Sequence, residues 1–193
     1  MAEGQAGGPV IGLIGAAAAM VQTSRVGVLA TPATVASEAY RSSIEALHPG
    51  TLVVEQACPE FVPLIESGDL SSDELRRTAK EYLHPLLEAS VESIVLGCTH
   101  YPLLEPVLRQ LLPDSVQLID PAVGVARQLD AVLGVPKPLI GERLHLDDCR
   151  FCVTADPDGF ATRATPWLGE RPLVRLEVPV SYTHLTLPTK RIV

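Results

Sequence analysis

Residues 93–102 read SIVLGCTHYP, and this stretch decides the fold. Its first part, Ser93–Cys98, is apolar almost throughout, which is typical of a parallel strand covered on both faces. Pro102 follows closely, and proline is favoured in the first turn of a helix, where its missing N–H costs nothing. A buried strand that passes directly into a helix predicts an α/β unit.

The same alternation extends in both directions along the chain. Further strands are expected at Val10–Gly15, Arg25–Thr31, Thr51–Cys58, Val116–Asp120, Phe151–Ala155 and Leu173–Val178. Apolar residues at helical spacing predict helices at Thr34–Leu47, Ser71–Leu87, Pro102–Leu112 and Ala122–Leu133. The pattern predicts an α/β fold, a parallel sheet with helices on both faces, whose active site lies beyond the carboxyl ends of the strands.

Two of these helices carry signals at or near their ends. Ser71 and Glu74 have the spacing of a capping box at the start of one helix. Pro85 lies inside the same helix and is expected to kink or break it. Gly134 follows the last of the four helices and is a natural residue to end it.

The composition excludes several classes of protein. The chain has 193 residues, 47% of them apolar, so it can bury a sizeable core. Its net charge of −8 argues against a nucleic-acid or anionic-membrane partner, because both need clustered Lys and Arg. No apolar run reaches the roughly 20 residues of a membrane span, and the N-terminus lacks the basic start of a secretion signal. A cytoplasmic location is therefore expected.

Cys98 is the strongest candidate for chemistry. It ends a predicted strand just before a predicted helix, whose N-terminal N–H groups and partial positive charge favour a thiolate. Thr99 is a candidate N-cap, and His100 is close enough in sequence to orient the thiol or exchange protons near it. The alternative is a buried cysteine followed by a histidine in a turn, and the local pattern leaves both interpretations open.

Thr31 and Thr34 form a second candidate site at another strand-to-helix junction. Two hydroxyls at this spacing, together with backbone N–H groups, have the chemistry to hold a carboxylate. The alternative is that Thr34 is simply a helix cap.

The other cysteines indicate no cofactor. Cys58 is expected to be a packed thiol at a strand end. Cys149 and Cys152 form a Cys-x-x-Cys with His145 upstream, but a structural zinc site needs four ligands and the chain has no second cysteine pair. A redox pair would open a helix, whereas this segment is predicted to be a strand. Neither a metal nor an organic cofactor is expected.

The segment Leu96–Leu104 resembles the second cysteine motif of the glutamate racemases, within the aspartate/glutamate racemase family. Other segments resemble that family in the same order, namely Pro9–Ile14, Gly27–Thr31 with Thr34, Ala57–Leu64, Ile119–Ala122 and Phe151–Phe160. The resemblance implies a cofactor-independent isomerase that interconverts L- and D-glutamate and supplies D-glutamate for peptidoglycan, and so for the cell wall and cell shape.

The resemblance also implies roles for individual residues. The family has two similar α/β lobes with the active site between them, and each lobe contributes one cysteine. One cysteine, as thiolate, removes the α-proton, and the other, as thiol, returns a proton to the opposite face. By this match Cys98 is one of the pair and His100 is the histidine beside it. Thr99 and His100 match substrate-contacting residues, and Thr31 and Thr34 match hydroxyls near the substrate carboxylate and amine.

The chain departs from the family in its first lobe. The family's Asp-Ser-Gly, Pro-Tyr-Gly and Ala-Cys-Asn-Thr segments, the last with the other catalytic cysteine, have no counterpart, and Gly15–Ala19 replaces a Glu-Pro-Gly. The expectation is an N-terminally truncated racemase that is inactive as written. Residues 9–120 would form one full lobe, residues 121–179 the return segment of the other lobe, and residues 180–193 a foreign or disordered tail.

Three alternatives stay open at this point. The nearest alternative is a relative that acts on aspartate or another amino acid. A cysteine hydrolase using Cys98 and His100 is a second, although an i, i+2 pair across a turn need not bring the imidazole to the sulfur. A non-enzymatic packing domain with a passive Cys98 is the third. A homodimer is left open for all of them.

Overall fold

The computed structural model describes residues 10–134 and 146–178. They belong to two compact units, residues 1–137 and residues 138–193, which are described separately below. His145 and the expected tail at residues 180–193 lie outside the described residues.

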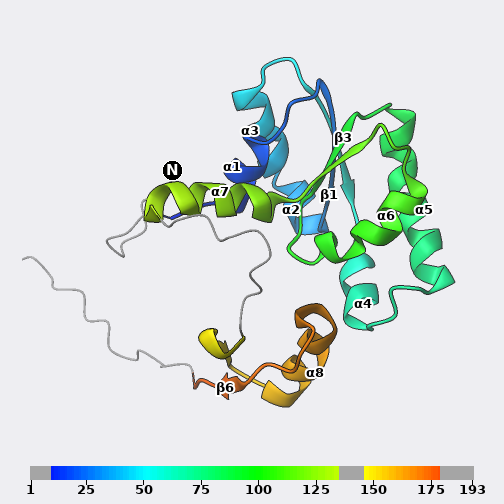
Figure 1. The fold of residues 1–193 in the computed structure, drawn as a ribbon. Coiled ribbons are helices and arrows are strands. Elements are labelled where there is room, and N and C mark those ends of the chain that lie inside the picture. The colour runs from blue at the N-terminus through cyan, green and yellow to red at the C-terminus, as the bar shows by residue number, and fades with distance from the viewer. Residues whose placement is uncertain (1–9, 135–145, 179–193) are drawn as a thin grey trace, which may run out of the picture. The chain divides into compact units, whose positions relative to one another are not determined.

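A four-stranded parallel sheet forms the centre of the first unit. Its strands are β1 (Arg25–Ala30), β2 (Leu52–Ala57), β3 (Ser93–Leu96) and β4 (Gln117–Ile119), in the order β2-β1-β3-β4 (Figure 1). Every residue of β3 and all but the first of β1 are buried, as expected for strands covered on both faces. The prediction of an α/β fold with a parallel sheet is confirmed.

Helices cover both faces of this sheet (Figure 1). On one face, Ile94 and Leu96 belong to an apolar cluster with side chains of α4 (Phe61–Glu66), α5 (Asp73–Glu88) and α6 (Glu105–Leu111). On the other face, Val28 and Val95 belong to a second cluster with side chains of α1 (Leu13–Ala18) and α3 (Ala39–Leu47). The alternation of side chains along β3 therefore supplies both halves of the core.

Helix α7 (Pro121–Leu133) packs on α1 in this same unit. A β-carbon at Gly124 would lie 2.7 Å from the carbonyl oxygen of Ala16, so the close approach requires glycine. The Asp120 carboxylate accepts a hydrogen bond from the N–H of Ala122 (2.8 Å), and Gly134 ends the helix in the left-handed conformation, as predicted.

Two expected elements differ from the structure. The expected strand Val10–Gly15 is wrong, because α1 begins at Leu13 and continues into alanines, the best helix formers. The expected helix Thr34–Leu47 is split into α2 (Pro32–Ala36) and α3, because Glu38 between them has a φ of 51°.

The start of α5 and the role of Pro85 also differ. The Ser72 hydroxyl caps α5 by accepting from the N–H of Leu75 (3.3 Å), whereas the Ser71 hydroxyl donates to Asp69. Pro85 does not break α5, which continues to Glu88. A proline so near the end of a helix removes one backbone hydrogen bond, a cost that the burial of Leu83 and Leu86 offsets.

The second unit is small. It begins with a 3-10 turn, η2 (Leu146–Asp148). Strands β5 (Phe151–Val153) and β6 (Val174–Leu176) follow and pair in parallel, and helix α8 (Pro157–Leu168) connects them. The rings of Phe151 and Phe160 lie 6.2 Å apart, which joins α8 to the sheet. That residues 121–179 complete another lobe stays a proposal.

Candidate active site

The chain segments that follow β2 and β3 are both hydrogen-bonded to the carboxyl end of β1, the strand between them. The N–H of Cys58, after β2, donates to the carbonyl of Ala30 (2.8 Å). The N–H of Gly97, after β3, donates to the carbonyl of Leu29 (2.7 Å). The candidate residues Thr31 and Cys98 therefore leave the sheet at the same edge, where ligand sites of parallel sheets lie.

A thiol, an imidazole and a carboxylate form a chain at this edge. Cys98 is half-buried, and its Sγ lies 3.9 Å from Nδ1 of His100. Nε2 of His100 lies 3.0 Å from Oε1 of Glu66, the last residue of α4. If Nε2 donates its proton to the carboxylate, Nδ1 is left as the acceptor that faces the thiol. The imidazole can then take the thiol proton or hold it beside the sulfur.

The helix that follows Cys98 starts later than expected. Residues Tyr101–Leu104 form a 3-10 turn, η1, and the α-helix α6 begins only at Glu105. One reason is Pro106, which has no N–H to donate to the carbonyl of Pro102. Thr99 is not the N-cap of either element, so the expectation of a cap at Thr99 is wrong, and the turn that begins within a few residues of Cys98 is 3-10 and not α-helical.

Thr31 and Thr34 do lie together. The Thr31 side chain caps α2 by accepting from the N–H of Thr34 (3.4 Å), and the two hydroxyl oxygens are 2.9 Å apart. The cap is therefore Thr31 and not Thr34. Contact of either hydroxyl with a substrate stays a proposal.

Cys58 is a packed thiol, as expected. It is 1% exposed, and burial raises the pKa of its thiol to about 12, so it stays protonated. The Tyr101 hydroxyl donates to the carbonyl oxygen of Cys58 (3.0 Å), and Phe61 packs edge-on against the Tyr101 ring. This region is a core and has no free thiolate.

The remaining cysteines lie in the second unit. Cys149 is half-buried, and Cys152 is exposed with its Sγ 3.8 Å from a Glu177 carboxylate oxygen. Within residues 10–134 and 146–178, no three His, Cys, Asp or Glu side chains lie together in a way that would hold a metal ion.

Two residues near Cys98 were not found by the sequence analysis. Glu66 lies at the end of a short helix and contacts His100 only because the chain returns to the same edge, so no local spacing marks it. Tyr40 lies on α3 with its hydroxyl buried and without a hydrogen-bond partner among the described residues. In the sequence, nothing in the helical pattern distinguishes Tyr40 from an ordinary core residue.

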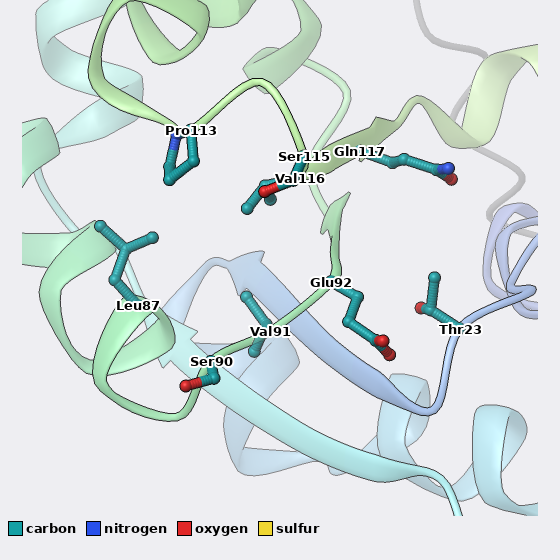
Figure 2. Close-up of a pocket in the computed structure, with 9 residues that line it drawn as sticks. All are labelled: Thr23, Leu87, Ser90, Val91, Glu92, Pro113, Ser115, Val116 and Gln117. Atoms are coloured by element: carbon teal, nitrogen blue, oxygen red, sulfur yellow. The ribbon is translucent and has the colours of Figure 1, made fainter.

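A hollow in the first unit lies away from this edge. It measures about 510 Å³ and opens at the amino end of the sheet, where Thr23, Glu92 and Gln117 come before or at the start of β1, β3 and β4 (Figure 2). The Glu92 carboxylate accepts from the N–H groups of Ser24 (3.0 Å) and Arg25 (3.1 Å). Its carboxylate is occupied by backbone donors, so this hollow is a poor candidate for catalysis.

Comparisons with known proteins show what this chain is similar to. A glutamate racemase of Synechococcus sp. (strain CC9605) is 76% identical over 180 residues, covering 92% of this chain and 68% of the relative. A glutamate racemase of Prochlorococcus marinus (strain NATL2A) is 44% identical over 168 residues, covering 87% of this chain and 63% of the relative. The chain thus spans about two thirds of the length of these relatives.

Solved structures give the same result. The glutamate racemase of Francisella tularensis in complex with D-glutamate matches with a TM-score of 0.72 and 31% identity, over 86% of this chain and 62% of that one. A glutamate racemase isoform of Bacillus anthracis matches with a TM-score of 0.76 and 28% identity, over 90% and 66%. The family model described as Asp/Glu/Hydantoin racemase matches residues 1–129. The resemblance is confirmed, and this chain belongs to the Asp/Glu/hydantoin racemase family.

Proposed function

We propose that this chain carries the half of a glutamate racemase active site that is built around Cys98. The observation that carries the proposal is the Cys98–His100–Glu66 contact chain at the carboxyl edge of the sheet. It is supported by the 76% identity with a glutamate racemase, an enzyme whose reaction needs a base that can also act as an acid.

In this proposal Cys98 works on one face of the substrate. Its thiolate removes the α-proton of glutamate, the electron pair of the broken C–H bond stays on the α-carbon, and the sulfur becomes a thiol. In the opposite direction the thiol returns its proton to the same face. His100, held by Glu66, keeps the sulfur in position and stabilises the thiolate when protonated. Thr31, Thr34 and Thr99 bind the substrate's carboxylate and amine.

Inversion also needs an acid on the opposite face of the α-carbon. Cys58 does not meet that need, because its buried thiol is out of reach of a substrate and its raised pKa makes it a weak acid. We therefore propose that the 193 residues alone do not racemise glutamate at a useful rate, but do exchange the α-proton of one enantiomer.

The test is α-proton exchange in D₂O. Each enantiomer of glutamate is incubated separately with the chain, and the α-proton is followed by NMR. We expect exchange with retention for one enantiomer, loss of that exchange in Cys98→Ala, and no change in the control Cys152→Ala, an exposed thiol in the second unit. Inversion of both enantiomers would contradict the single-base proposal, and no exchange of either would contradict the half-site. Repeating the assay with aspartate tests the nearest alternative substrate.

A cysteine hydrolase is the second candidate, and one observation favours it. The structure does bring His100 Nδ1 to 3.9 Å from Cys98 Sγ, and Glu66 orients the imidazole, which is the order of a cysteine–histidine–carboxylate triad. An activated ester would acylate Cys98 in such an enzyme. Mass spectrometry of the intact chain, with no acyl adduct on Cys98, is the expected result for a racemase.

The location and assembly of the protein are proposed from the resemblance alone. None of the helices within the described ranges is long and apolar enough to cross a membrane. We propose a cytoplasmic enzyme that acts without a cofactor and assembles as a homodimer. Analytical ultracentrifugation tests the last point, because a monomer at all concentrations would contradict it.

A further inference from the structure

We propose that Tyr40 is a positioning residue for Cys98, whose buried hydroxyl donates a hydrogen bond to the sulfur, directly or through one water, when the thiol loses its proton. The inference rests on the proposed function of Cys98 as a base. Tyr40 comes from helix α3, which packs on the face of the sheet opposite to α4, whose Glu66 contacts His100.

The placement of the Tyr40 ring supports this role. Tyr40 is the second residue of α3 and is 1% exposed. A β-carbon at Gly97 would lie 3.0 Å from Cε2 of Tyr40, the ring carbon next to the one that bears the hydroxyl. It would also lie 2.9 Å from the carbonyl oxygen of Leu29. The absence of a side chain at residue 97 therefore lets the phenol end of Tyr40 lie against the backbone that leads directly into Cys98.

The Tyr40 hydroxyl has no hydrogen-bond partner within the described part of the chain. Burying a polar group without a partner destabilises a fold, so such groups are rare and call for an explanation. By contrast, the buried Tyr101 hydroxyl already donates to Cys58 O, and the Tyr82 hydroxyl accepts from the N–H of Glu60. Tyr40 is therefore the one of these three tyrosines whose hydroxyl makes no hydrogen bond among the described residues.

The electrostatics keep Tyr40 a donor when Cys98 ionises. Burial, and then the charge of Cys98, raise the pKa of Tyr40 to about 12, so the hydroxyl keeps its proton. The charge of an ionised Cys98 thus acts on Tyr40 through space, while the Tyr40 hydroxyl stays a donor.

The other ionisable groups around the strand end are already engaged. His100 faces the sulfur and contacts Glu66, while Cys58 and Tyr101 both have raised pKa values. The exception is on the Tyr40 side, where Arg41 Nε lies 3.3 Å from Glu55 Oε2. The buried Oε1 of that carboxylate has no hydrogen-bond partner among the described residues, and burial raises the pKa of Glu55.

The experiment compares Tyr40→Phe with the unaltered 193-residue chain, and Tyr82→Phe is the matched control. The rate of Cys98 alkylation by iodoacetamide is measured across the pH range by mass spectrometry of its peptide. In Tyr40→Phe we expect the pH of half-maximal rate to rise by about one unit, a tenfold change in thiolate population at neutral pH. Tyr82→Phe is expected to leave the profile unchanged.

A purely structural role gives a different result. If the hydroxyl is only an unpaired core group, Tyr40→Phe raises the melting temperature and leaves the alkylation profile where it was, which overturns the inference. Because alkylation needs no racemase activity, the two proposals are separable. A shifted profile in a chain that exchanges no glutamate α-proton would support the role of Tyr40 and contradict the proposed function.

Discussion

The two edges of the same sheet use their carboxylates differently. At the amino edge, Glu92 accepts from two backbone N–H groups and from the Ser24 hydroxyl, beside the hollow of about 510 Å³. At the carboxyl edge, Glu66 instead contacts an imidazole that faces a half-buried thiol. A carboxylate that caps the backbone stabilises the fold, whereas one that orients a histidine leaves reactive groups available. The use of the polar groups, more than the volume of the hollow, marks the site.

Replacing Cys98 at the carboxyl edge and Glu92 at the amino edge gives the largest contrast in the rate of α-proton exchange. Cys98→Ala is expected to lower α-proton exchange by more than about 1000-fold, because no other described thiol at this edge is exposed. Glu92→Gln is expected to leave the exchange rate within twofold of the original, a roughly neutral effect for a group away from the chemistry. NMR in D₂O measures both. A comparable loss in both variants would mean that the two edges are not functionally distinct.

Displacing the backbone at the carboxyl edge is the next largest effect. In Gly97→Ala the new β-carbon would lie 2.9 Å from Leu29 O, so the backbone before Cys98 must shift. We expect exchange to fall about 100-fold, because misplacing a reacting group by about 1 Å has this cost. Gly15→Ala is the control, since a β-carbon there meets nothing within 4 Å. Normal exchange by a folded Gly97→Ala chain would show that the close approach is unimportant.

Weakening the link to His100 has a smaller effect. Glu66→Gln keeps the shape of the side chain but removes the charged acceptor that orients the imidazole beside the sulfur. We expect the rate of Cys98 alkylation at neutral pH to fall about three- to tenfold. Glu74→Gln, at an exposed position of α5, serves as control. An unchanged alkylation rate would reduce the Glu66–His100 contact to an ordinary surface pair of small effect.

The smallest effect belongs to the amino edge. Glu92→Gln weakens the hydrogen bonds to Ser24 and Arg25 and is expected to lower the free energy of unfolding by about 1 kcal/mol. Urea denaturation measures it, with Glu74→Gln again as reference. If Glu66→Gln lowered the free energy of unfolding by more than Glu92→Gln does, Glu66 and not Glu92 would be the carboxylate that stabilises the fold.

The sequence was informative where one pattern implies one structure. The apolar runs of β1 and β3 predict buried parallel strands, and strand ends predict the edge that holds Cys98 and Thr31. It was less informative where two local choices compete. Val10–Gly15 has β-branched residues followed by alanines, and the helix prevailed. Ser71 and Ser72 are adjacent candidates for one cap, and Pro106 sets the start of α6 in a segment that looks uniformly helical.

Glu66 and Tyr40 were missed by the sequence analysis for a different reason. Glu66 contacts His100 and Tyr40 lies against Gly97 because of the topology of the sheet, since α4 follows β2 and α3 packs on the opposite face. Neither has a spacing to the Cys98 motif that a single sequence could reveal. Contacts that depend on strand order become visible only when that order, β2-β1-β3-β4, is known.

The hydrogen bonds from Cys58 and Gly97 to the end of β1 have a consequence for the dynamics of the domain. Amides joined to a central, doubly covered strand exchange with solvent only when most of the unit unfolds. The backbone around the site thus belongs to the slowest-exchanging part of the first unit, while the exposed end of α7 is free to fray. The entropy of ordering this edge is lost during folding, so a substrate that binds there meets groups that need no further ordering.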